Sequence, residues 1–211
     1  MTGTGLRELK KERTRRHISD TAARLFAERG YEHVAVTDVA REAEVAEQTV
    51  YNYFPTKEQL VTDRDQPVQE RLSDLIRSRP PGITAAAAVR DYVLGFAAGI
   101  RDIPPAQWRG ELGYLTAVSP AVRRLALDMT ARQAAAIAAA ISDTSAVSPA
   151  VARLEGIALA GVFQIIISES GRRTVDGQSQ EQISDELYSL VGNLVDELDL
   201  WFSVSSRSAR I

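Results

Sequence analysis

The sequence contains no cysteine and only two histidines among its 211 residues. Without thiols the chain can form no disulfide, no thiolate zinc site and no cysteine nucleophile. His17 and His33 have no partner at a metal-ligand spacing, so we expect neither of them to bind a metal. A glycine-rich phosphate loop and a serine–histidine pair in a catalytic context are also missing. These absences argue against the common enzyme classes, and no cofactor is expected.

Long hydrophobic runs are missing as well. No stretch of about 18 uncharged apolar residues appears, and the N-terminus lacks the apolar core of a signal peptide. We therefore expect a cytoplasmic protein that does not enter a membrane. Hydrophobic residues still make up 45% of the chain, which is enough for a folded core.

The alternation of apolar and polar residues that marks a half-buried strand is absent too. Apolar residues instead recur every three or four positions, between Ser or Thr caps, prolines and glycines. This pattern predicts an all-α fold of about nine helices. Pro67 interrupts the fourth, so we expect either a bend near residues 64–67 or a simple helix end there. Gly30 and Gly171 are expected to end helices, and Thr56–Gln59 and Ser179–Gln182 to form capping boxes. The expected helices are 10–29, 36–43, 47–54, one that starts at 57 and includes Pro67, 84–100, 106–117, 120–142, 149–170 and 180–202.

Charge is distributed unevenly around a net value of −3. Acidic side chains dominate the last thirty residues, whereas the first sixteen are basic. A basic N-terminal arm can follow a nucleic-acid backbone, although a solvated run of terminal charge remains the alternative. The basic residues are Arg7, Lys10, Lys11, Arg13, Arg15 and Arg16.

Residues 36–57 read as two short helices joined by a tight turn. The Thr37 hydroxyl can cap the first helix, and Pro55 ends the second at Phe54. One face of the second helix must pack on a supporting helix, which leaves the other face free. Amides and hydroxyls on that face can pair with base edges and phosphates in a DNA major groove. A solvated helical hairpin is the alternative reading. The free face carries Gln48, Thr49, Tyr51 and Asn52.

Three segments in this region carry a family resemblance. Residues 24–31 (RLFAERGY), 36–43 (VTDVAREA) and 49–58 (TVYNYFPTKE) resemble the DNA-binding domain of the tetracycline-repressor (TetR) family of bacterial regulators. The resemblance implies a helix-turn-helix domain at residues 1–56 and a ligand-binding and dimerisation domain at residues 57–211. It also implies that Lys57 contacts a phosphate. The full set expected to contact DNA is Thr37, Arg41, Glu47, Gln48, Thr49, Tyr51, Asn52, Tyr53 and Lys57.

Two residues depart from the family's pattern. Glu44 stands where the family usually has a glycine in the turn, and a non-glycine residue held left-handed there costs about 1 kcal/mol. Ala46 replaces a small hydroxyl residue at the cap of the second helix, which loses about another 1 kcal/mol. Glu47 would in addition repel a phosphate at this helix end. The turn is therefore expected to be remodelled or strained.

The remaining two-thirds of the chain suggests two uses. Apolar residues around the last two expected helices could build a four-helix bundle across a two-fold axis, although a purely intramolecular core explains them too. Aromatic and polar residues of the middle helices could line a cavity for a small, partly apolar molecule, although core packing is again the alternative. The interface candidates are Leu159, Phe163, Ile166, Leu187, Leu190, Val191, Leu194, Val195 and Leu198. The cavity candidates are Tyr92, Phe96, Trp108, Glu111, Tyr114, Met129, Gln133 and Phe163.

These expectations combine into one functional hypothesis. The protein would be a homodimeric transcriptional regulator, a repressor that a small-molecule effector releases from a palindromic operator in double-stranded DNA. A helical enzyme or small-molecule-binding bundle with a merely structural hairpin is the main alternative, because scattered carboxylates are compatible with catalysis. A helix-turn-helix protein that only assembles with partners is a third.

Overall fold

The structure is a computed structural model that describes residues 3–63 and 65–208, and these residues form helices and turns but no strand. The expected all-α class is therefore confirmed. The N-terminal part, here called the head, comprises α1 (Gly3–Arg29), the 3-10 turn η1 (Tyr31–His33), α2 (Val36–Glu42), α3 (Glu47–Tyr53) and α4 (Lys57–Thr62).

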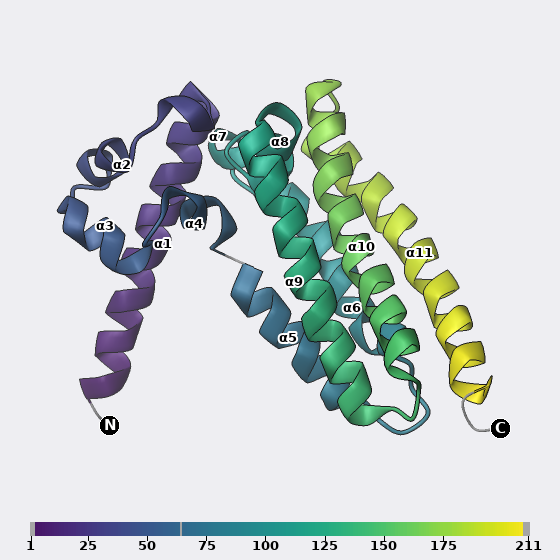
Figure 1. Ribbon diagram of the computed structural model, residues 1–211. Helices are drawn as coiled ribbons and strands as arrows, with labels where there is room; N and C mark the ends of the chain where they lie inside the picture. Colours follow the sequence, from purple (N-terminus) through teal and green to yellow (C-terminus); the bar gives the residue numbers. More distant parts are fainter. Residues whose placement is uncertain (1–2, 64, 209–211) are drawn as a thin grey trace.

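The rest of the chain, here called the body, is a larger helical bundle. Helices α9, α10 and α11 run side by side, α6 packs on α11 and α5, and α5 packs on α9 (Figure 1). The short α7 and α8 fill the space between the bundle and α1. The bounds are α5 (Asp65–Arg77), α6 (Ala85–Ala98), η2 (Gly99–Asp102), α7 (Pro105–Trp108), α8 (Leu112–Val118), α9 (Pro120–Thr144), α10 (Pro149–Val175) and α11 (Gln180–Ser208).

Two hydrophobic cores stabilise these parts. The body core is built from α5, α6, α9, α10 and α11, whereas the head core lies between α1 and the short helices α2, α3 and α4. Leu115 of α8 and Val122 of α9 are fully buried in the head core. The head therefore completes its own interior with two side chains from the body.

Helix ends are where the structure departs most from the sequence pattern. Of the two outcomes expected at residues 64–67, the structure has the helix end rather than the bend, because α4 stops at Thr62 and α5 starts at Asp65. Pro67 lies in the first turn of α5, where a missing backbone N–H costs no hydrogen bond. Arg64 lies outside the described residues.

Gly171 does not end its helix, so that prediction is wrong. Helix α10 continues to Val175, and Gly171 is buried against α8. A Cβ atom at Gly171 would overlap the carbonyl oxygen of Gly113. Glycine is present there because two helices touch backbone to backbone.

A similar contact splits the helix expected at residues 106–117 into α7 and α8. Gly110 lies between these two helices, and a Cβ atom there would overlap the carbonyl oxygen of Ala23 in α1. This close approach fixes the head against the body at one point. Ser119 supplies another, because its hydroxyl donates to the Glu32 carboxylate over 2.8 Å and also caps α9.

Capping was predicted with mixed success. The Ser179–Gln182 box is confirmed, since the Ser179 amide donates to Gln182 Oε1 over 3.1 Å and the Gln182 amide donates to Ser179 Oγ over 3.2 Å. Helix α4 begins at Lys57 as expected, but the Thr56 side chain makes no capping bond. Gly30 follows the last residue of α1 as expected, and its φ of 81° with ψ 146° is a conformation that glycine adopts readily and other residues rarely do.

Within the described residues, α10 is long and apolar enough to cross a membrane by length and composition alone. It packs against α8, α9 and α11, which is how the central helix of a folded bundle behaves. A buried helix that is apolar nearly all round needs neighbours on several sides, and these three supply them.

Candidate nucleic-acid interface and ligand cavity

Helix α2 is started by an acid rather than by the expected threonine. Ala35 is the residue before the helix, and its amide donates to the Asp38 carboxylate over 2.9 Å. Arg41 donates to the same carboxylate over 2.5 Å. The Ala35 amide and then Arg41 hold the pKa of Asp38 below its ordinary value. The predicted Thr37 cap is therefore wrong, and Thr37 remains exposed.

The turn between α2 and α3 places a non-glycine residue in the left-handed region. Glu44 has φ 54° and is the one non-glycine residue of the described chain with positive φ. The turn closes when the Val45 amide donates to the Ala40 carbonyl over 3.0 Å. A side chain in the left-handed region is strained, so strain, one of the two outcomes expected for this turn, is present.

Helix α3 holds one face inward and one face outward. Val50 is fully buried in the head core, as is Phe54 just after the helix. Ala46 precedes the helix without a side-chain cap, as expected. On the outer face the Gln48 amide donates to Asn52 Oδ1 over 3.2 Å, across one turn of helix. The outer face comprises the exposed Gln48, Tyr51 and Asn52 and the half-buried Thr49.

Arg15 fixes the end of α3 from beneath. Its guanidinium donates to the Asp63 carboxylate over 2.7 Å and to the Tyr53 carbonyl over 3.1 Å, and it lies 4.8 Å from the centre of the Phe54 ring. Arg15 therefore acts within the fold rather than as part of a free basic arm. Tyr53, expected to contact DNA, is half-buried against the head core.

Lys57 also has an intramolecular role. Its ammonium donates to the Tyr31 carbonyl over 2.6 Å and lies 4.1 Å from the centre of the Tyr31 ring. Partial burial lowers the pKa of Lys57. A phosphate contact by Lys57 would have to share the ammonium with Tyr31. The other two expected residues, Arg41 and Glu47, are exposed.

A cavity of about 320 Å³ lies where the head meets the body. Six of the eight cavity candidates line it, namely Phe96, Trp108, Glu111, Met129, Gln133 and Phe163. The other two do not. Tyr92 packs on the far side of Phe163, with ring centres 6.4 Å apart, and Tyr114 packs on the head core. Helical spacing alone does not show which aromatic side chains face a cavity and which pack in a core.

The sequence reading missed one wall of this cavity. Asp20 and Ala23 of α1, and residues 60–63 at the end of α4, line it together with the body residues. Nothing in the local pattern of α1 distinguishes these positions from a supporting helix. The cavity therefore lies between the two parts of the chain rather than inside the C-terminal part alone.

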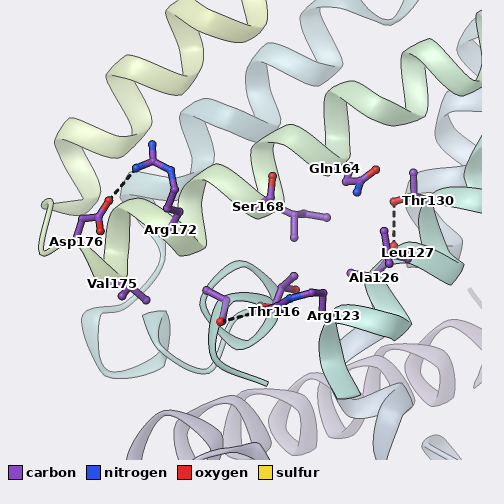
Figure 2. A pocket seen from close by; sticks show the side chains of 12 residues that line it. Thr116, Arg123, Ala126, Leu127, Thr130, Gln164, Ser168, Arg172, Val175 and Asp176 are labelled. Atoms are coloured by element: carbon purple, nitrogen blue, oxygen red, sulfur yellow. Dashed lines mark hydrogen bonds and ion pairs between the residues drawn. The ribbon is translucent and has the colours of Figure 1, made fainter. Parts of the chain in front are cut away.

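A second hollow, of about 440 Å³, opens on the outside between α8, α9 and α10. Figure 2 shows that its two arginines are engaged with neighbours. Arg123 donates to the carbonyls of Thr116 and Ala117 over 3.2 and 3.0 Å, and Arg172 donates to Asp176 over 2.8 Å. Both arginines that line this outer hollow are therefore already hydrogen-bonded within the protein.

Six of the nine interface candidates require a correction. These six are nearly fully buried within the single chain, because they form the inward faces of α10 and α11 and pack on α6 and on one another. They have no surface left for a second subunit. The six are Leu159, Phe163, Ile166, Leu187, Val191 and Val195, whereas Leu190, Leu194 and Leu198 are partly exposed.

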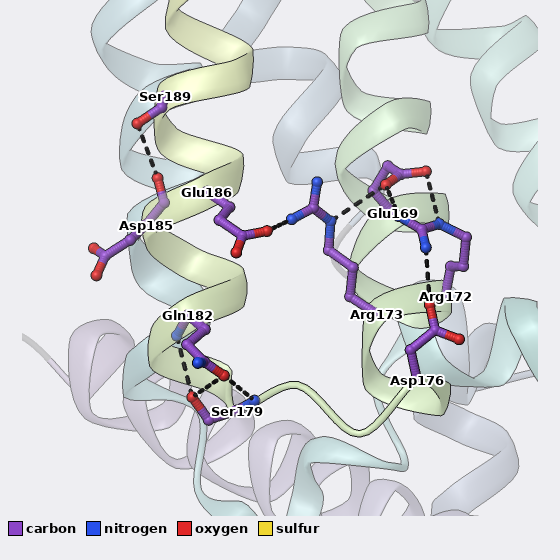
Figure 3. Close-up of polar contacts among 9 residues, drawn as sticks. All are labelled: Glu169, Arg172, Arg173, Asp176, Ser179, Gln182, Asp185, Glu186 and Ser189. Carbon is purple, nitrogen blue, oxygen red and sulfur yellow. Dashed lines mark hydrogen bonds and ion pairs between the residues drawn. The ribbon is translucent and has the colours of Figure 1, made fainter.

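The outward face of α10 and α11 is apolar at other positions. Leu154 and Ile157 of α10 are 53% and 51% exposed, and Trp201 of α11 is 37% exposed. The two helices are held together at one end by Arg173, which pairs with Glu186 of α11 and with Glu169 of its own helix (Figure 3). The two helices are also in contact along the chain's bundle, so their exposed apolar residues belong to neighbouring elements.

Comparison with known proteins gives the head a clear relationship. The sequence pattern described as "Bacterial regulatory proteins, tetR family" matches residues 18–63. The HTH-type transcriptional regulator TcmR of Streptomyces glaucescens is 30% identical over 100 residues, which are 47% of this chain and 44% of that protein. The putative mycofactocin biosynthesis transcriptional regulator MftR of Mycobacterium tuberculosis is 42% identical over 48 residues, 23% of this chain and 24% of that protein. Both matches span less than half of the relative.

The fold of the whole chain is similar to a solved structure. NalD, titled the secondary repressor of the MexAB-OprM multidrug efflux pump in Pseudomonas aeruginosa, superposes with a TM-score of 0.54 at 18% identity. The similarity covers 85% of this chain and 96% of that chain. It extends the likeness in fold from the head to the body.

Proposed function

Because this chain belongs to the TetR family of bacterial regulatory proteins, whose pattern covers residues 18–63, we propose that it is a sequence-specific DNA-binding transcriptional regulator and not an enzyme. It acts as a repressor that a small-molecule effector releases from a palindromic operator. The observation that carries this proposal is the exposed polar face of α3, held on a buried platform by Val50, Phe54 and Arg15.

The head meets DNA through α3. The amides of Gln48 and Asn52 can each pair with an adenine edge once their mutual hydrogen bond opens, and Tyr51 can reach a phosphate. A helix of two turns presents few base contacts, so one head reads a short half-site. Specific binding then requires a second head on a second half-site, about one helical turn or more away.

A second copy of the chain supplies that head. On α10, the positions Leu154, Ile157, Gly161 and Ile165 follow one another at helical spacing and form one stripe. No atom lies within 4 Å of a Cβ built on Gly161, so another backbone can approach there. The partly exposed Leu190 and Leu194 lie with Trp201 along one stripe of α11. Two such surfaces form a four-helix bundle about a two-fold axis.

The effector binds in the cavity between head and body. A ligand there touches α1 and α4 of the head and α6, α9 and α10 of the body at the same time. It can change the preferred position of the head only by binding one arrangement more tightly than another, which amounts to about 1 to 3 kcal/mol in known cases. We also propose a cytoplasmic location and a boundary between the two domains at residue 56 in the sequence; α4, which follows that boundary, packs on the head core.

The decisive experiment is selection of bound fragments from random DNA with the purified protein. A two-fold symmetric consensus is expected. Binding to that consensus should weaken at least tenfold in Tyr51→Ala and Gln48→Ala, because each removes a contact from α3. Arg124→Ala, which changes an exposed cation on α9, is the matched control and should bind like the parent. An asymmetric or absent consensus would refute the proposal.

A further inference from the structure

The cavity between head and body has a polar lining that points to one kind of ligand. We propose that it binds a ring-sized apolar molecule carrying a protonated amine, and that Asp20 of α1 receives the ammonium group. This inference rests on the proposed function for the role of the cavity as an effector site, and it adds the chemistry of the effector.

The apolar part of the lining sets the body of the ligand. Phe96 and Phe163 meet edge to face with ring centres 5.7 Å apart, and Met129 and Trp108 lie around them. Aromatic rings and a thioether form a surface that packs well on a flat hydrocarbon ring system. The volume of about 320 Å³ suits a molecule of two or three fused rings.

The ionisable part of the lining sets the charge of the ligand. Among the described residues that line the cavity, the ionisable side chains are Asp20, Asp63 and Glu111, and all three are acidic. Asp63 is paired with Arg15. Asp20 has no ion pair or hydrogen bond to any described residue, so its carboxylate is available to a cation. An anionic ligand would be repelled by the same lining, and a cationic ligand is attracted.

Gln133 provides an independent sign of a ligand. Its side chain is only 6% exposed and lines the cavity, yet it makes no hydrogen bond to the residues that the structure describes. Trp108, 8% exposed, also lines the cavity, and its indole N–H makes no hydrogen bond to the described residues. Among the described residues, the fully buried polar side-chain atoms without a partner are Glu155 Oε1 and Gln178 Oε1, so the polar atoms of Gln133 and Trp108 are not sealed in and stay open to a partner in the cavity. Gln133 therefore serves a neutral polar group on the ligand.

The ammonium site explains how binding of such a ligand would affect the position of the DNA-binding helices. Asp20 belongs to α1, the helix on which α2 and α4 pack and α2 in turn holds α3, whereas Gln133 and Phe163 belong to the body. A ligand held by both sides ties the position of α1 to the position of α9 and α10. The strength of that tie depends on the ligand's charge, since the head contributes the carboxylate.

Three naphthalene probes of one shape test the proposal by calorimetry on the full chain. They are 2-naphthylmethylammonium, 2-naphthylmethanol and 2-naphthoate, which are cationic, neutral and anionic. The ammonium should bind about tenfold more tightly than the alcohol, and the naphthoate should bind more weakly than either. Equal affinities, tighter binding of the naphthoate, or no binding of any probe would overturn the proposal.

Two cavity variants locate the contacts. Asp20→Asn should weaken the ammonium about tenfold and leave the alcohol unchanged, whereas Gln133→Leu should weaken the alcohol about fivefold. Gln164→Leu, which lies in the outer hollow, is the matched control and should change neither. If only Gln164→Leu reduces affinity, the probes occupy the outer hollow and the proposal fails.

This test does not depend on DNA, so the two proposals fail separately. If the ammonium binds as expected and operator affinity does not change with saturating probe, the ligand chemistry stands and the effector role of the cavity is refuted. If operator binding responds to other molecules but the three probes show no charge preference, the regulator stands and the amine proposal is refuted.

Discussion

Glu44 is a residue at which the chain carries avoidable strain. Its φ of 54° is left-handed, and glycine adopts that conformation without a steric penalty. Glu44→Gly should therefore raise the free energy of unfolding by about 1 kcal/mol, as measured by urea denaturation. Glu44→Ala keeps the Cβ atom and should leave stability unchanged. A gain of the same size in both variants would instead implicate the loss of the carboxylate.

Glu155 makes stability depend on pH. It is 3% exposed with Oε1 unpaired, because nearby Arg79 gives its donors to Ile76, Ile83, Thr144 and Ser145. Burial raises its pKa to about 7, and the charge of Arg79 only partly opposes this. The folded protein thus holds a proton that the unfolded chain releases near pH 4.5, so stability is lost as pH rises from about 4.5 to about 7.

The comparison with Glu155→Gln isolates this effect. The wild-type protein should lose about 3 kcal/mol relative to the variant between pH 4.5 and pH 7.5. Urea denaturation of both proteins across that range measures the difference. Parallel pH profiles would show that the Glu155 carboxyl does not titrate as described.

For single residues, the sequence predicted which side chains of α3 are exposed better than it predicted hydrogen-bond partners. The outward position of Gln48, Tyr51 and Asn52 followed from helical spacing and is confirmed by their exposure. The hydrogen-bond partners of Arg15 and Lys57 could not be predicted. Arg15 donates to Asp63, forty-eight positions away, and Lys57 donates to a backbone carbonyl. Partners distant in sequence leave no periodic signal.

Helices α8 and α10 touch at two glycines, and this contact gives a prediction for a whole element. Gly171→Ala should lower the free energy of unfolding by about 2 to 3 kcal/mol, because the new Cβ atom must displace the Gly113 backbone. Gly95→Ala in α6 is the control, since nothing lies within 4 Å of its Cβ position. It should gain about 0.5 to 1 kcal/mol from helix propensity. Similar losses in both variants would contradict the packing.

Helix starts were easier to predict than helix ends. Ser or Thr followed by proline gave the first residues of α9 and α10 correctly, since a cap is a local chemical requirement. Glycine proved ambiguous, because Gly171 and Gly110 serve close backbone contact rather than a stop signal. Only the neighbouring helix distinguishes these uses.

The outward surface of α10 and α11 gives a prediction for the whole molecule. Ile157→Glu should convert the proposed dimer into a monomer at micromolar concentration, because it places a charge at the centre of an apolar interface. Sedimentation velocity measures the mass, and operator affinity should fall with it. Ile83→Glu, at a residue 43% exposed in the loop before α6, is the control and should remain dimeric. A monomeric parent protein would refute the interface outright.

The assembly of the parts was the least predictable level. Apolar residues at helical spacing identified α10 and α11 as packing helices, but spacing cannot tell an inward stripe from an outward one when both are apolar. Leu159 and Ile157 are two residues apart and face opposite environments. The cavity was predicted from its body residues, whereas its head wall depends on how α1 docks against α7, which no local pattern encodes.

The two body side chains in the head core restrict how this protein could be re-engineered. Leu115 and Val122 lie more than fifty residues beyond the end of α4, yet they fill the space beneath the DNA-reading helices. A chimaera that grafts residues 1–63 onto another sensor would leave that space empty unless the recipient offers equivalent side chains. Exchange of heads between such proteins should therefore succeed only when the segment from α7 to the first turn of α9 travels with them.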